Sequence, residues 1–262
     1  MFDYHMHSSL SFDSECSALK MAQKAAKLGL KEICFTDHFD YLFNQNDKHY
    51  LFTKEDYSNA YDNLFVDGIK IKKGVEFGLT PWNAPQLEEL IKNINFDFII
   101  GSVHYVKSGD PYTEEKFWNG RSVKDSFRDY LESVYNCVNV HNNFNVLGHL
   151  TYVCKCPLNP TKEPMLYKDF SDITDEIMKI LAQKGIGLEV NTSGIDSAGV
   201  FLPNKEFLIR FKELGGEIVT VGTDSHNEQR IGQYVPEALE MIKDIFGYVC
   251  TFENRKPVFN KL

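Results

Sequence analysis

Histidines recur in this sequence at positions that suit metal ions. The chain opens with Phe2-Asp3-Tyr4-His5-Met6-His7, and in an extended strand His5 and His7 point to the same face. Two imidazoles on one face can hold one metal ion, although a His-x-His pair alone is weak evidence. Six of the eight histidines lie at or just after the end of a predicted strand, at positions 5, 7, 38, 104, 149 and 226.

Carboxylates accompany these histidines. Asp37, Glu76 and Asp224 stand at ends of predicted strands, and Asp13 lies in the loop after the first strand. Gathering so many imidazoles in one cleft is unfavourable unless metal ions or anions hold them together. We therefore predict a cluster of metal ions. Zinc, iron and manganese all accept imidazole and carboxylate ligands, so the identity of the metal stays open.

The elements that must position these residues alternate along the chain. Apolar runs predict strands over residues 2–7, 31–36, 69–77, 96–103, 145–148, 186–190 and 217–222, with a last short strand over 248–252. Helical spacing predicts helices over 16–28, 53–65, 84–94, 122–141, 170–184, 204–214 and 235–246. This alternation predicts an α/β fold with a parallel sheet, closed or nearly closed into a (β/α)7 barrel. The carboxyl ends of barrel strands meet on one face, where active sites lie.

Composition restricts the class of protein. A length of 262 residues fits one barrel, and we predict a single domain over residues 1–262. Lys and Arg total 28 against 37 Asp and Glu, and the net charge of -9 argues against a nucleic-acid partner. The first residues contain no basic, apolar leader, so we expect a cytoplasmic protein without a membrane segment. The six scattered cysteines suit a reducing compartment and free thiols.

Seven short motifs follow one another in a fixed order along almost the whole chain. They are His5-x-His7, Thr36-Asp37-His38, Gly74-Val75-Glu76, Ser102-Val103-His104, Gly148-His149, Glu189-Val190-Asn191-Thr192-Ser193-Gly194 and Thr223-Asp224-Ser225-His226. The ordered set resembles that of the polymerase-and-histidinol-phosphatase (PHP) family, and within it the histidinol-phosphate phosphatases. This resemblance implies a distorted (β/α)7 barrel with three divalent metal ions at the carboxyl ends of its strands.

The resemblance also implies a ligand set for each ion. It assigns His5, His7, Glu76 and Asp224 to one ion, Glu76, His104 and His149 to a second, and Asp13, His38 and His226 to a third. Some relatives have His where this chain has Asp13. Glu76 bridges two ions in this scheme, and Asp37 supports a ligand rather than being one.

The resemblance implies hydrolysis of a phosphomonoester, with a small phosphorylated molecule as the substrate. Closely spaced divalent ions make a bridging hydroxide available near neutral pH and neutralise phosphate oxygens, so no covalent intermediate is required. The resemblance makes L-histidinol phosphate, in histidine biosynthesis, the expected substrate. We expect Glu76, Asp224 and His226 to act in catalysis, with Asp224 or His226 passing a proton to the leaving alkoxide.

The sequence departs from the family at the expected phosphate-binding positions. Histidinol-phosphate phosphatases commonly carry one arginine soon after the fifth-strand histidine and another just beyond the Asn-Thr-Ser-Gly turn. Here these neighbourhoods contain Lys155 and Asp196 instead. We expect Lys155, Ser193 and Arg230 to bind the substrate, although Lys155 also fits a solvated loop lysine. Two other functions stay open: a PHP phosphatase acting on another small phosphate ester or on phosphotyrosine, and an accessory module for nucleic acids. The sequence predicts no oligomeric state.

Two further features allow two interpretations each. The loop aromatics Phe39, Tyr41, Phe43, Tyr105 and Trp118 either wall a substrate pocket or pack beneath the long loops. Glu189, inside the sixth strand, either faces a cationic group of the substrate or hydrogen-bonds within the barrel.

Overall fold

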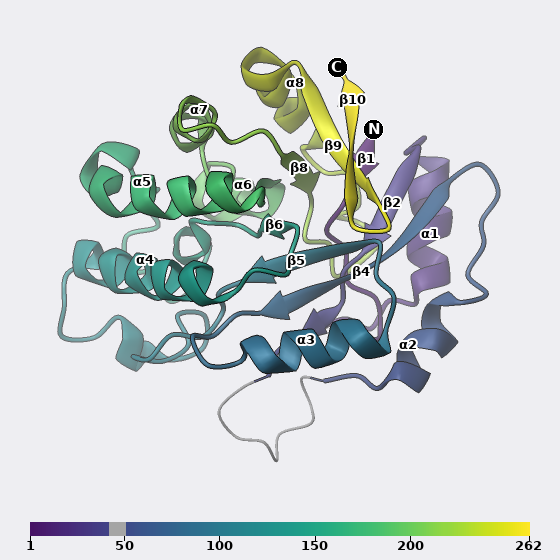
Figure 1. Cartoon of the computed structure of the whole chain (residues 1–262), viewed down its shortest axis with the longest axis horizontal. Helices are drawn as coiled ribbons and strands as arrows, with labels where there is room; N and C mark the ends of the chain where they lie inside the picture. Colours follow the sequence, from purple (N-terminus) through teal and green to yellow (C-terminus); the bar gives the residue numbers. More distant parts are fainter. Residues whose placement is uncertain (42–50) are drawn as a thin grey trace.

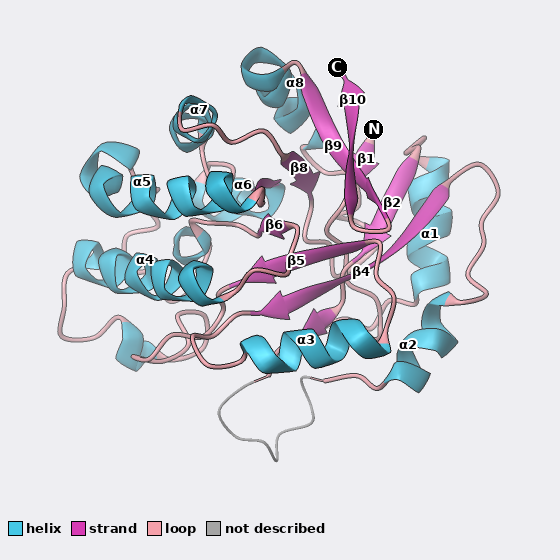
Figure 2. Ribbon diagram, in the orientation of Figure 1, coloured by secondary structure: helices cyan, strands magenta, loops and turns pink. Residues whose placement is uncertain are grey.

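Seven parallel strands form the barrel wall in the computed structural model, which describes residues 1–41 and 51–262. In their order around the wall they are β1 (Phe2–Asp3), β2 (Glu32–Phe35), β4 (Lys70–Gly78), β5 (Phe98–Ser102), β6 (Val146–Leu147), β7 (Gly187–Asn191) and β8 (Val219–Gly222). The two-residue strand β3 (His38–Phe39) continues beyond β2 and pairs with β4. The predicted (β/α)7 barrel is confirmed (Figure 2).

The barrel closes where the first strand meets the last. Beyond Asp3 the chain leaves regular strand geometry but continues along β8: the Tyr4 amide donates to the Val221 carbonyl (3.0 Å), and the Asp224 amide to the His5 carbonyl (2.8 Å). Residues 2–7 were predicted as one strand, and only the first two of them form β1. The His5 and His7 side chains nevertheless lie on the same side of the chain, as predicted, with their ring centres 5.0 Å apart.

Helices cover the outside of the barrel (Figure 1). They are α1 (Ala18–Lys27), α2 (Lys54–Tyr61), α3 (Ala84–Asn93), α4 (Val123–Val140), α5 (Tyr167–Lys184), α6 (Ile195–Ala198), α7 (Lys205–Glu213) and α8 (Val235–Phe246), with short 3-10 turns at Glu115–Phe117, Tyr152–Cys154 and Thr192–Gly194. Capping boxes start α2 at Thr53 and α4 at Ser122, because each cap side chain and an aspartate three residues later satisfy otherwise unpaired amides. Gly185 ends α5 at a φ of 66°, a left-handed conformation that favours glycine.

Two of the predicted helices have different limits in the structure. Helix α2 ends at Tyr61 rather than near residue 65. Helix α5 begins at Tyr167, before the predicted residue 170, and bends at Phe170, whose φ of -137° departs from helical geometry. Within the described residues, no helix is long and apolar enough to cross a bilayer.

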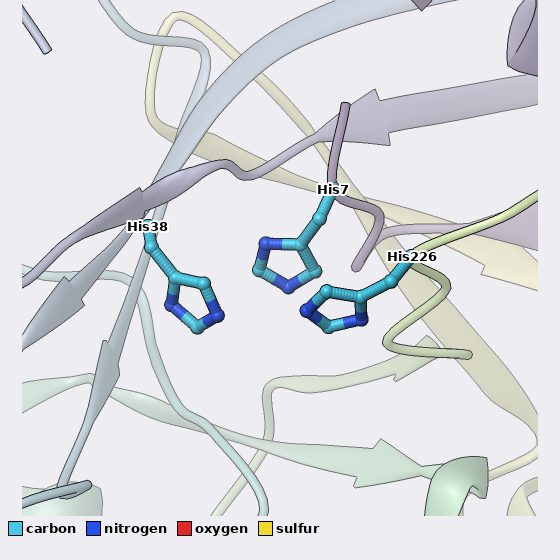
Figure 3. Close-up of side chains that lie close together, drawn as sticks. All are labelled: His7, His38 and His226. Carbon is cyan, nitrogen blue, oxygen red and sulfur yellow. The ribbon is translucent and has the colours of Figure 1, made fainter. Parts of the chain in front are cut away.

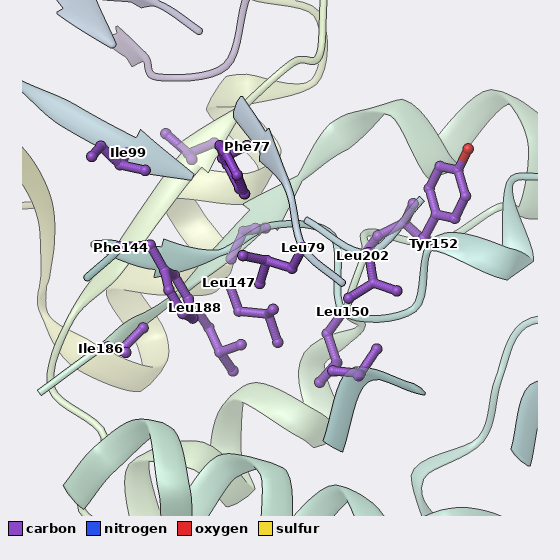
Figure 4. Close-up of a cluster of buried hydrophobic side chains, with 14 of the residues drawn as sticks. Phe77, Leu79, Ile99, Phe144, Leu147, Leu150, Tyr152, Ile186, Leu188 and Leu202 are labelled. Carbon is purple, nitrogen blue, oxygen red and sulfur yellow. The ribbon is translucent and has the colours of Figure 1, made fainter. Parts of the chain in front are cut away.

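Apolar side chains fill the layer between the strands and the helices. Figure 4 shows part of this layer, in which Phe77 of β4, Leu147 of β6 and Leu188 of β7 pack with Phe144 and Leu150; all five are buried. A second cluster lies toward the end of the barrel where the strands begin. It includes Tyr4, Cys34, Phe98, Ile100, Val146, Cys250 and Phe252. All six cysteines of the chain are unpaired, as expected.

An antiparallel hairpin covers the end of the barrel where the strands begin. Strand β9 (Tyr248–Glu253) pairs with β10 (Lys256–Lys261), and Asn254 and Arg255 turn between them at positive φ (49° and 65°), as two-residue hairpin turns require. The Arg255 amide donates to the Asp97 carbonyl just before β5, which ties the hairpin to that end. The sequence predicted β9 but not β10, because Pro257 and the charged ends of that strand weaken its strand pattern.

Candidate metal centre

The carboxyl ends of the strands surround a cavity of about 690 Å³. Its wall includes seven of the nine predicted metal ligands, namely Asp13, His38, Glu76, His104, His149, Asp224 and His226. The other two, His5 and His7, are buried beneath it at 0% exposure. The structure therefore brings all nine predicted residues together at the face on which the fold predicts a site.

Glu76 lies at the centre of the cluster and contacts histidines with both carboxylate oxygens. Its Oε2 lies 3.2 Å from His5 Nε2 and 3.1 Å from His38 Nδ1. Its Oε1 lies 2.9 Å from His149 Nε2 and 3.2 Å from His104 Nε2. Burial alone would raise the pKa of Glu76, but the charges of the surrounding histidines outweigh it and hold the pKa well below its ordinary value. Glu76 is therefore an ionised carboxylate with the geometry of a bridge between two ligand groups.

Asp224 faces the first-strand histidines from the end of β8. Its Oδ1 lies 3.3 Å from His7 Nε2 and 3.7 Å from His5 Nε2, whereas its Oδ2 pairs with the Lys155 ammonium. Its φ of 56° is left-handed, a conformation that costs a non-glycine residue energy and recurs at functional sites. Burial would raise the pKa of Asp224, and the charges of Lys155 and His5 lower it well below the usual range.

A third group of side chains lies on the outer side of the first two. Asp13 Oδ2 lies 3.0 Å from His226 Nε2 and 3.4 Å from His38 Nε2. The rings of His7, His38 and His226 converge (Figure 3), with the His7 ring centre 4.3 Å from that of His38 and 4.2 Å from that of His226. The Asp13, His38 and His226 side chains thus gather as expected, and His7 lies within reach of the same group.

The polar atoms at the centre fit metal ions better than hydrogen bonds. Five buried atoms make no hydrogen bond with any described residue: His5 Nε2, His7 Nε2, His38 Nδ1, Glu76 Oε2 and His226 Nε2. Each of these imidazole nitrogens lies 3.0–3.5 Å from a carboxylate oxygen, and Glu76 Oε2 lies at such distances from imidazole nitrogens, but the angles do not fit hydrogen bonds. Unpaired buried polar atoms are costly, and convergent imidazole nitrogens and carboxylate oxygens are the donor set of divalent transition metals.

Several of these atoms form compact groups that could each hold an ion. Among the described residues they are His5, His7 and Glu76; Glu76, His104 and His149; His7, His38 and His226; and His38, Asp40 and His104. The first group contains three of the four residues predicted for one ion, and the second is the complete set predicted for another. The last two share His38 and extend the cluster toward the cavity mouth.

Carboxylates outside the cluster orient its histidines. Glu189 accepts a hydrogen bond from His5 Nδ1 (2.6 Å) and another from the His149 amide (2.9 Å), so it hydrogen-bonds within the barrel. Asp37 accepts from the Ser11 hydroxyl (2.9 Å), which lies 3.1 Å from His7 Nδ1. Fixing one ring nitrogen in this way directs the other toward a metal.

Asp40 is a participant that the sequence analysis missed. Its carboxylate lies 3.2 Å from His104 Nδ1, and together with Glu76 it outweighs burial and raises the pKa of His104 to about 9. The available signal was its spacing, because Asp40 follows His38 by two residues in an extended segment and thus points to the same side. The short strand β3, which supplies this segment, was also not predicted.

The three predicted substrate-binding residues line the cavity. Lys155 is not a solvated lysine, since its ammonium pairs with Asp224, lies 3.1 Å from the Ser193 hydroxyl and lies 5.3 Å from the centre of the Tyr152 ring. Arg230 reaches the cavity from the loop after β8 and pairs with Asp196. Two basic side chains thus stand on the cavity wall.

The loop aromatics divide between the two interpretations. Tyr105 lines the cavity. Trp118 is buried, with its indole donating to the Pro111 carbonyl (2.8 Å), and Phe39 packs against Phe77, so both belong to the core. Phe43 lies outside the described residues. Three aromatic residues of the wall were not singled out in the sequence, namely Phe12, Tyr112 and Tyr152.

Comparison with known proteins gives one consistent result. The PHP domain matches residues 3–193. Histidinol-phosphatase of Lactococcus lactis subsp. lactis is 34% identical over 99% of this chain and 97% of its own length. A probable histidinol-phosphatase of Clostridium acetobutylicum is 28% identical over 99% of this chain and 96% of its own length.

Solved structures agree with the sequence matches. Histidinol phosphate phosphatase of Lactococcus lactis subsp. lactis, solved with zinc, L-histidinol and phosphate, superposes with a TM-score of 0.87 at 32% identity and covers 98% of each chain. A putative histidinol phosphatase of Listeria monocytogenes superposes with a TM-score of 0.73 at 16% identity, over 90% of this chain and 99% of its own, and shows the same fold.

Proposed function

This chain belongs to the PHP domain family, and from this premise we propose that it hydrolyses L-histidinol phosphate to L-histidinol and phosphate, a step of histidine biosynthesis. The observation that carries the proposal is the full-length likeness to a phosphatase whose structure holds zinc, L-histidinol and phosphate, at a TM-score of 0.87. The convergent histidines and carboxylates of the cavity supply the ligand chemistry that such a reaction needs.

Three ligand groups are proposed to hold three divalent ions. One consists of His5, His7, Glu76 and Asp224, the second of Glu76, His104 and His149, and the third of Asp13, His38 and His226. The unpaired atoms of His5, His7, His38, Glu76 and His226 support this assignment. When bound, such ions supply a hydroxide nucleophile near neutral pH and neutralise phosphate oxygens.

The side chains of the cavity wall complete the phosphate site in this proposal. Lys155 and Arg230 supply positive charge, and the Ser193 hydroxyl, 3.1 Å from the Lys155 ammonium, supplies a hydrogen bond. The Asp224 carbonyl, at 2.9 Å, holds His226 through Nδ1, which leaves Nε2 of His226 for the third ion, so Asp224 is the remaining candidate to pass a proton to the leaving alkoxide.

The outer wall of the cavity suits the leaving group. Aromatic rings from Phe12, Tyr105 and Tyr112 and carboxylates from Asp110 and Glu114 line it. Aromatic faces and negative charge attract an aromatic, cationic molecule, and L-histidinol carries both an imidazole and an amine. The composition of this wall therefore favours histidinol phosphate over a small sugar phosphate.

The test is a steady-state assay of purified, metal-analysed protein with L-histidinol phosphate and a panel of small phosphate esters that includes phosphotyrosine. We expect kcat/KM for L-histidinol phosphate to be on the order of 10⁴ M⁻¹s⁻¹ or more and to exceed that of every other ester. Slow turnover of L-histidinol phosphate beside fast turnover of another ester would refute the substrate and leave phosphomonoester hydrolysis in place.

A further inference from the structure

The Asp196 carboxylate joins two loops beside the cavity. Its Oδ2 pairs with Nη1 of Arg230, and its Oδ1 accepts a hydrogen bond of 2.7 Å from the Tyr234 hydroxyl. Asp196 belongs to α6, which follows β7, whereas Arg230 and Tyr234 belong to the loop between β8 and α8. The Thr192 hydroxyl ties the same segments by donating to the Gln233 carbonyl at 2.8 Å. The position of Arg230 therefore depends on a residue of the neighbouring loop.

Arg230 keeps one donor unused at the cavity wall. Its Nη2 is buried and makes no hydrogen bond to any residue in the described part of the chain. Arg230 lines the cavity together with Ser193, Asp224 and His226, whereas Asp196 does not line it. A guanidinium is a rigid planar fork, so holding Nη1 also fixes the direction of Nη2. An unpaired cationic donor at the wall of a metal-binding cavity points to an anionic ligand.

We propose that Asp196 is a positioning residue for phosphate: its carboxylate, held in turn by Tyr234, orients the Arg230 guanidinium so that Nη2 meets a phosphate oxygen of the substrate. This inference rests on the proposed phosphatase function. Asp196 acts through Arg230 and makes no contact with the substrate. The conformation of Tyr234 agrees with this role, because its left-handed φ of 60° is uncommon for an aromatic residue and recurs at functional sites.

Two effects of Asp196 on phosphate have opposite signs, and the structure decides between them. A carboxylate near the site repels phosphate, whereas a well-held guanidinium attracts it. The Asp196 side chain is 43% exposed, so water screens its charge. The guanidinium nitrogen that would meet the phosphate is buried, where charge-assisted hydrogen bonds are strong. Orientation therefore outweighs repulsion, and removing the carboxylate should weaken phosphate binding.

The test compares Asp196→Asn with the wild type in two measurements on metal-loaded protein. One is the steady-state KM and kcat for the best ester, and the other is the Kd for inorganic phosphate by isothermal titration calorimetry. Loss of one well-placed charge-assisted hydrogen bond corresponds to an increase of about tenfold in both KM and Kd. We expect kcat to change by less than about threefold, because binding is lost equally in the ground and transition states. Asp196→Glu should restore most of the affinity, and Tyr234→Phe should weaken it in the same direction.

Asp172→Asn is the matched control, since it removes another exposed Arg-Asp pair, that of Arg128 and Asp172 at 2.7 Å between α4 and α5. All constants should stay unchanged in this variant, and the melting temperature should stay unchanged in both variants because exposed ion pairs add little stability. An unchanged or lower Kd for phosphate in Asp196→Asn would overturn the proposal, as would an unchanged Kd in Arg230→Ala. If the wild type hydrolyses no phosphate ester, the proposed function fails, and the phosphate titration still decides the role of Asp196.

Discussion

The histidines of the cluster have opposite tendencies to bind protons. Burial would lower the pKa of His5, but the charges of Glu189, Glu76 and Asp224 raise it well above its ordinary value. Burial, His226 and His38 lower the pKa of His7 well below its ordinary value. The carboxylates around His5 therefore favour a cation at its ring, whereas the His7 ring stays neutral and keeps a lone pair to donate. Protons and metal ions compete for the same atoms, so the affinity for metal should fall as the pH falls.

Glu76 is the side chain on which two ligand groups depend. Replacing it in Glu76→Gln keeps the shape but removes the charge that five histidine contacts share. We expect loss of at least one bound ion and a decrease in kcat/KM of at least about 100-fold, measured by elemental analysis and steady-state kinetics. Glu88→Gln is the control, because the exposed Glu88 carboxylate bonds the Asn143 side-chain amide (3.0 Å) and is not part of the cluster. Full metal content with normal turnover in Glu76→Gln would refute the bridging role.

Asp40 should tune the metal site through His104. In Asp40→Asn the His104 ring loses the carboxylate at 3.2 Å that fixes its orientation and increases its basicity. Loss of such a partner typically lowers metal affinity by about 10–100-fold. Competition with a chelator of known affinity measures this change. The exposed Asp62, which pairs with Lys73 at 2.9 Å, provides the control Asp62→Asn, and equal affinities in the two variants would count against the assignment.

Most elements could be predicted from the sequence because one pattern repeats. Apolar strand, polar strand end and amphipathic helix follow each other seven times, so the ligands at positions 76, 104 and 149 fall at strand ends whose positions apolar periodicity reveals. The features that were missed lack this periodicity. Strand β3 has only two residues, Asp40 directly follows this short strand, and the link between Asp196 and Arg230 joins residues 34 positions apart in sequence. Such contacts depend on how loops fold over the barrel.

Helix α4 ends at a histidine that should make stability depend on pH. His141 is 1% exposed; its Nε2 donates to the Thr80 carbonyl (2.8 Å), and its Nδ1 is buried with no hydrogen-bond partner among the residues described. Burial, aided by the charge of Lys184, lowers its pKa below 6.5. The unfolded chain therefore binds a proton more readily, so this stability is present above pH 6.5 and is lost as the pH falls through the folded-state pKa.

The variant His141→Gln isolates this contribution from that of the other histidines. Comparing free energies of unfolding in urea at pH 8 and pH 5.5 should show a larger decrease in the wild type than in His141→Gln. Because pH 5.5 lies one unit below the ordinary pKa of 6.5, the excess should reach at most about 1.4 kcal/mol. An equal decrease in both proteins would contradict the role of His141.

The two ends of the barrel have different roles: one carries the candidate metal site, and the other carries a packed apolar cluster that stabilises the fold. The proposed metal ligands lie at the carboxyl ends of the strands, whereas Tyr4, Phe98 and Phe252 pack at the opposite end, with the Phe98 and Phe252 ring centres 4.7 Å apart. The hairpin of β9 and β10 closes this second end. In barrels of this kind, substitutions far from the carboxyl-end face act through stability rather than through the reaction.

Phe252→Ala tests this separation. The variant removes a side chain that is 1% exposed and should lower the free energy of unfolding by about 3–5 kcal/mol, measured with denaturant. Metal content and kcat/KM of the folded fraction should stay the same. Phe259→Ala, on the outer strand of the hairpin at 51% exposure, should change stability by less than about 0.5 kcal/mol. A folded Phe252→Ala protein without metal would show that the two ends are coupled.

The seam between the first and last barrel strands joins residues that are synthesised far apart in time. His5 and His7 leave the ribosome more than 200 residues before Asp224 and Ser225, whose backbone groups they bond. Because chains fold from the amino end as they are made, the two histidines have no backbone partner across this seam until β8 and the residues that follow it have been synthesised. A chain truncated before β8 would thus lack both the closing strand and two of the proposed ligands, Asp224 and His226, and it should bind metal more weakly than a chain that includes them.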